Sequence, residues 1–127
     1  MPATADEALI LDSGSSNRAG YRLRVYANGT TALQQGDTPI RKQIPPALVK
    51  RFFADLQAAG PLDQLKVAHC MKSASFGSTT QIGYRGVMSP DVSCPGTSPI
   101  ARALSIDVTA IAGAAGVSML PRPLPSP

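Results

Sequence analysis

The sequence predicts an α+β fold, a four-stranded antiparallel sheet with two helices packed on one face. Strand-like alternation of apolar and polar residues occurs over 20–35 and 66–87, and helical spacing of apolar residues over 44–60 and 98–115. Hairpin, helix, hairpin and helix thus follow one another, an order typical of one antiparallel sheet with helices on one side. The chain has 127 residues, of which 43% are hydrophobic, enough for one domain with one core.

Composition divides the chain into three parts. Residues 1–19 are expected to be a flexible leader, in which the apolar run 8–11 could add a short edge strand. Residues 20–116 are expected to form the single α+β domain. Residues 117–127 contain repeated prolines, which favour polyproline II and predict a flexible tail.

An Asn-Gly pair predicts the turn of the first hairpin. A two-residue loop would place Leu33 on the same face as the arginines of the preceding strand. A three-residue loop, 27–29, instead pairs Val25 with Thr31 and Leu23 with Leu33, and it keeps the apolar side chains together. We therefore expect the longer loop, with its glycine in the left-handed region.

Both helices have clear sequence boundaries. The helix over 44–60 begins at two prolines and ends at Gly-Pro, and at least one of Phe52 and Phe53 should be fully buried. The helix over 98–115 is expected to have Ser98 as its N-cap, followed by a proline and an apolar stripe.

The second hairpin is expected to contain one cysteine and to precede the other. Strands over 66–76 and 79–87 would be joined at Gly77-Ser78, with Cys70 facing the core. A following loop with Pro and Gly could bring Cys94 back to it. A disulfide would close a loop of about 25 residues and stabilise the fold by roughly 3.5 kcal/mol. The alternative is two buried free thiols.

This layout resembles small uncharacterised bacterial exported domains over residues 20–115. The residues that carry the resemblance are the Asn-Gly turn, the helix motif RFFADL at 51–56, and the Cys-Met-Lys-Ser strand that begins at Cys70. Such domains have no agreed activity, so the resemblance transfers no catalytic residue.

Cysteine usage and composition predict where the protein works. Two cysteines in a small chain favour a mature periplasmic or extracellular protein, with the cytoplasm as the alternative. The first residues lack the basic and apolar regions of a secretory signal, and no apolar run approaches the length of about 20 residues that spans a bilayer.

The residues with catalytic potential do not form a recognisable active site. His69 and Cys70 are adjacent, so on a strand they point to opposite faces and make a poor nucleophile–base pair. No serine elbow or phosphate-binding loop occurs, and no cofactor is expected. His69 and Met71 share a face. With the cysteines they define the alternative function, a small soft-metal-binding or thiol-dependent protein.

Arg22, Arg24 and Tyr26 share one face of the first hairpin and are the candidate ligand-facing residues. A basic face with an aromatic ring could hold single-stranded nucleic acid. The net charge of only +4 and the few aromatic residues argue against nucleic acid, and an ordinary solvated strand face is the alternative. A protein partner or self-association is expected instead. The sequence therefore predicts a non-enzymatic exported binding or structural module, possibly self-assembling.

Overall fold

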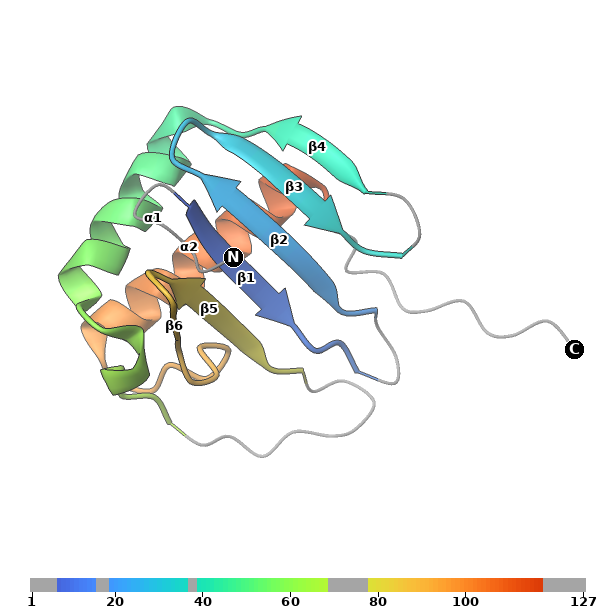
Figure 1. Ribbon diagram of the computed structural model, residues 1–127. Helices are drawn as coiled ribbons and strands as arrows, with labels where there is room; N and C mark the ends of the chain where they lie inside the picture. Colours follow the sequence, from blue (N-terminus) through green and yellow to red (C-terminus); the bar gives the residue numbers. More distant parts are fainter. Residues whose placement is uncertain (1–6, 16–18, 37–38, 69–77, 118–127) are drawn as a thin grey trace, which may run out of the picture.

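A computed structural model describes residues 7–15, 19–36, 39–68 and 78–117 (Figure 1). Within these residues, six strands form one antiparallel sheet in the order β4-β3-β2-β1-β5-β6, and two helices pack together behind it. The α+β class is confirmed, and the number of strands is corrected from four to six. The elements are β1 (Glu7–Asp12), β2 (Tyr21–Tyr26), β3 (Thr30–Gln34), β4 (Ile40–Gln43), α1 (Pro46–Ala59), the 3-10 helix η1 (Leu62–Gln64), β5 (Thr80–Tyr84), β6 (Val87–Met88) and α2 (Pro99–Ala115).

Strand β1 corrects the prediction of a leader with an edge strand. It lies inside the sheet, where Ile10 pairs with Leu23 of β2 on one side and with Ile82 of β5 on the other. Ala8 and Ile10 are fully buried. The apolar run is continuous because Ala8 and Ile10 face the helices while Leu9 is partly buried on the opposite side of the sheet. Such a run is the pattern of an inner strand.

The first hairpin has the expected register. Leu23 pairs with Leu33 and Val25 with Thr31, across a loop whose Gly29 has φ +94°. The buried Leu23 and Val25 alternate with exposed arginines along β2. The apolar parity of the two strands was therefore sufficient to choose the three-residue loop.

The second hairpin differs from the prediction. Strand β5 pairs with β1 on one side and turns directly into β6 on the other, through Arg85 and Gly86 at φ 52° and 77°. Beyond β6, the backbone N–H of Ser89 donates to the Ile82 carbonyl oxygen at 2.8 Å. Both sides of β5 are thus occupied by described residues, and the strand predicted over 66–76 lies mostly outside the described residues. Two successive left-handed residues make the tight turn that suits a twisted hairpin.

The two helices form as predicted and complete one core. Pro45 precedes the first residue of α1 without a capping side-chain hydrogen bond, whereas Ser98 caps α2 by accepting a hydrogen bond from the Ala101 N–H at 3.3 Å. Phe52 is fully buried and Phe53 is 8% exposed. The buried faces of both helices meet the side of the sheet that carries Leu23 and the other inward residues. The opposite side of the described sheet is not covered by either helix (Figure 1).

Candidate functional site

The uncovered side of the sheet carries three arginines on neighbouring strands, which we call the arginine face (Arg22, Arg24 and Arg41). Arg24 of β2 pairs with Ala32 of β3, and Ala32 pairs with Arg41 of β4, so all three side chains leave the same side of the sheet. Arg22 lies two residues before Arg24 and shares its side. All three are exposed. The structure thus places the predicted Arg22 and Arg24 together and adds Arg41.

A hollow of about 260 Å³ lies between the two β2 arginines and strand β3. Ala32 and Gln34 lie at its β3 side, where the small alanine side chain leaves space between longer neighbours. One of the arginines is already paired, because Arg24 donates to Glu7 Oε1 at 3.2 Å. Within the described residues, neither Arg22 nor Arg41 has an acidic side chain at ion-pair distance. The guanidinium groups of Arg22 and Arg41 therefore face solvent, and Arg22 lines the hollow.

Tyr26 lies at the edge of the arginine face rather than among the arginines. Its strand partner is Glu7 of β1, and it is partly buried. Partly buried Leu9 and Leu11 of β1 lie directly beside Arg24 and Arg22. Tyr26, which sequence analysis named as a candidate ligand-facing residue, thus lies beside Glu7. The apolar surface next to the arginines comes from leucines of the expected leader.

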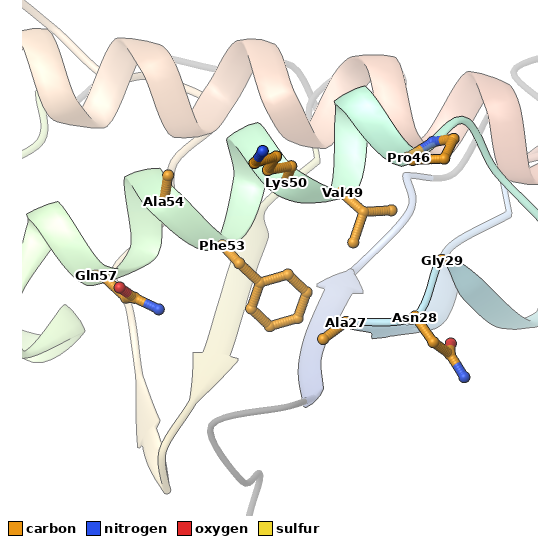
Figure 2. A pocket seen from close by; sticks show the side chains of 9 residues that line it. All are labelled: Ala27, Asn28, Gly29, Pro46, Val49, Lys50, Phe53, Ala54 and Gln57. Carbon is orange, nitrogen blue, oxygen red and sulfur yellow. The ribbon is translucent and has the colours of Figure 1, made fainter.

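A second cavity lies between α1 and the β2–β3 turn, and we call it the turn pocket. It has a volume of about 450 Å³. The turn supplies Ala27, Asn28 and Gly29, and α1 supplies Pro46, Val49, Lys50, Phe53, Ala54 and Gln57. In Figure 2, Val49 and Phe53 point from α1 toward Ala27. Sequence analysis predicted a buried phenylalanine on this helix but no cavity beside it, so it missed the pocket.

Hydrogen bonds hold the turn side of this pocket in place. The Gln43 side chain donates through Nε2 to the Asn28 carbonyl oxygen at 2.8 Å and accepts from Thr30 Oγ1 at 3.2 Å. The Ile44 N–H donates to the Gly29 carbonyl oxygen at 3.0 Å. A Cβ atom at Gly29 would lie 2.6 Å from Gln43 Nε2. The turn can pack this closely only with glycine at that position.

A buried carboxyl group lies between the helices. Asp107 of α2 accepts a hydrogen bond from Arg51 Nε of α1 at 2.8 Å, and its side chain is 1% exposed. Its other oxygen, Oδ2, has no hydrogen-bond partner among the described residues. Burial, and after it the neighbouring Asp55, raise the pKa of Asp107 to about 7 against the opposing effect of Arg51. Sequence analysis missed this group, although its spacing from Leu104 and Ile111 places it on the apolar stripe.

The sulfur and histidine predictions fall partly outside the described residues. Cys94 is 8% exposed and is not a free thiol. Cys70, His69 and Met71 lie outside the described residues, so the Cys70–Cys94 pairing and the soft-metal alternative stay predictions. In the part of the chain that the structure describes, no group of three or more His, Cys, Asp or Glu side chains could hold a metal ion.

Neither described helix has the length and hydropathy that a membrane span requires. Comparisons of the chain with protein-family models, with curated proteins and with solved structures found no match.

Proposed function

We propose that this protein is a non-enzymatic binding module that uses the arginine face to hold an acidic protein partner. The observation that carries the proposal is the grouping of three exposed arginines on the side of the sheet that neither described helix covers. Antiparallel sheets often leave one face in solvent, but such a face usually mixes charges of both signs. Here Glu7 is the only acid among the described strand residues on this side.

The chemistry of the face suits carboxylate side chains. Arginine binds a carboxylate with two parallel hydrogen bonds, and it stays charged at any physiological pH. The hollow beside Arg22 offers room for one acidic side chain, and Leu9 and Leu11 offer apolar contact next to it. This combination of guanidinium groups with apolar surface is typical of protein interfaces.

Self-association through the same surface fits the structure less well. Two copies meeting face to face would bring arginines against arginines, and like charges repel. The edge strand β4 is also short, carries Arg41 and Lys42, and is flanked by Pro39 and Pro45. Short, charged and proline-flanked edges discourage pairing with another sheet. The proposal is therefore a partner of different composition.

Export from the cytoplasm remains part of the proposal and depends on the cysteines. A disulfide between Cys70 and Cys94 would persist only in an oxidising compartment. The absence of a free thiol at the buried Cys94 supports this assignment.

Titration with a hexaglutamate peptide, followed by backbone and arginine side-chain NMR signals, tests the proposal. We expect shifts confined to β1–β4 on the arginine-face side and an affinity that decreases as salt increases. Replacing Arg22 and Arg41 together by alanine should weaken binding about five-fold or more, since each exposed pair contributes up to about 1 kcal/mol.

Two controls make the test specific. Lys66→Ala and Arg102→Ala each remove one exposed positive charge away from the arginine face and should leave the affinity nearly unchanged. If these variants lost as much peptide affinity as the Arg22 and Arg41 replacement, net charge alone would explain the binding, and the assignment to the arginine face would be wrong. A single-stranded oligothymidylate that binds the same face more tightly than the peptide would reassign the partner to nucleic acid.

A further inference from the structure

We propose that the turn pocket is a second binding site, independent of the arginine face, that takes a small carboxylate with an apolar body. Its volume of about 450 Å³ lies within the range of small-molecule sites, about 300–1,000 Å³. It lies on the helix side of the β2–β3 hairpin. The arginines leave the opposite side of the same sheet.

The floor of the pocket is rigid and apolar. Phe53 is 8% exposed, and edge-to-face contacts fix its ring against Phe52 at 5.7 Å and against Tyr84 of β5 at 5.9 Å between ring centroids. Val49, one helical turn earlier, is 3% exposed. The small exposed parts of these side chains face Ala27 across the pocket (Figure 2). An apolar group that entered would contact surfaces that are already ordered.

The opposite wall is equally fixed. The hydrogen bonds of Gln43 and Ile44 attach the turn to the segment that leads into α1. The Asn28 side chain accepts from the Thr30 N–H at 2.9 Å, which orders the turn itself. A ligand that binds between two ordered walls loses less free energy to conformational ordering of the protein.

The polar residues of the pocket select the charge of the ligand. Among the described residues of the lining, Lys50 is the only one with an ionisable side chain, and the other polar side chains are the amides of Asn28 and Gln57. No acid among the described residues lies within ion-pair distance of Lys50. A carboxylate would therefore find one cation among the described lining residues, whereas a cationic ligand would find no counter-charge among them.

Phenylacetate and its neutral isostere phenylacetamide test the inference directly. In NMR titrations at millimolar concentration, we expect phenylacetate to shift signals of Ala27, Val49 and Phe53. Phenylacetamide should bind at least five-fold more weakly. Lys50→Gln should reduce phenylacetate affinity by a similar factor. Ala54→Leu, at an exposed lining position of α1, should block binding because the larger side chain fills the opening.

Two controls separate this site from the arginine face. Lys66→Gln and Arg22→Ala should leave phenylacetate binding unchanged, because neither residue lines the pocket. Equal binding of the acid and the amide would overturn the role of Lys50. The site itself would be overturned if the signals of the pocket residues did not shift, or if Arg22→Ala lost phenylacetate binding. Neither result would change the outcome of the hexaglutamate titration, which tests the arginine face separately.

Discussion

Replacing Asp107 by asparagine tests the buried carboxyl group between the helices. The substitution keeps an oxygen that can accept from Arg51 Nε, now 2.8 Å from Oδ1. It also supplies an N–H donor where Oδ2 has no partner. The amide is neutral at every pH, so the variant removes the titration and preserves the shape of the side chain.

The sign of the effect follows from the raised pKa. The folded carboxyl keeps its proton up to about pH 7, mainly because of burial, whereas an ordinary aspartate loses its proton near 3.8. Between these values the folded state binds more protons, so the stability of the wild type falls as the pH rises. At about 1.36 kcal/mol per pH unit, this group costs up to about 4 kcal/mol at pH 8. Asp107→Asn should recover much of that free energy at pH 8 and little at pH 4.5.

Urea unfolding of both proteins at several pH values between about 4.5 and 8 measures this difference. The contributions of groups that do not interact with Asp107 cancel when the two free energies of unfolding are subtracted. Asp63→Asn, at an exposed position in η1, is the matched control and should track the wild type. A difference between wild type and Asp107→Asn that stays constant across the range would refute the reasoning.

Three further predictions concern the fold. Gly29→Ala should lower the free energy of unfolding by about 1–3 kcal/mol, since φ is +94° and Cβ would meet Gln43. Gly113→Ala in α2 is the control, because a Cβ atom there would have no neighbouring atom within 4 Å. It should raise the free energy of unfolding by about 0.5–1 kcal/mol. Phe52→Ala should cost about 3–5 kcal/mol in urea unfolding, and an unchanged midpoint would contradict its place in the core. Unreduced, unfolded protein should contain no titratable thiol and should lose thermal stability in reductant; two thiols would contradict the Cys70–Cys94 bond and with it the proposed export.

Local signals predicted the elements whose boundaries depend on neighbouring residues. The helix over 46–59 follows from its prolines and apolar spacing, and the register of β2 with β3 follows from side-chain parity. Strands β1 and β4 are different, because their partners decide whether they form. Residues 8–11 become an inner strand only when β5 is available on the other side of β1, and that pairing cannot be inferred from residues near the run.

The candidate sites were predictable to different degrees. Alternation alone places Arg22 and Arg24 on one face, but Arg41 joins them only through the pairing of β4 with β3. The turn pocket depends on the distance between α1 and a turn, which no periodicity records. Asp107 could have been found, since a carboxylate on an apolar stripe needs a partner, and Arg51 is on the helix that packs against it.

The inner position of β1 gives the chain an order of assembly. Strands β1 to β4 are neighbours both in the sequence and in the sheet, so they can pair as soon as residues up to Gln43 have left the ribosome. The free edge of β1 then stays unpaired until β5, which ends at Tyr84, has also emerged. At about 5–20 residues per second, the wait is on the order of seconds. During that interval an apolar strand edge is exposed, the kind of surface on which nascent chains aggregate and chaperones act.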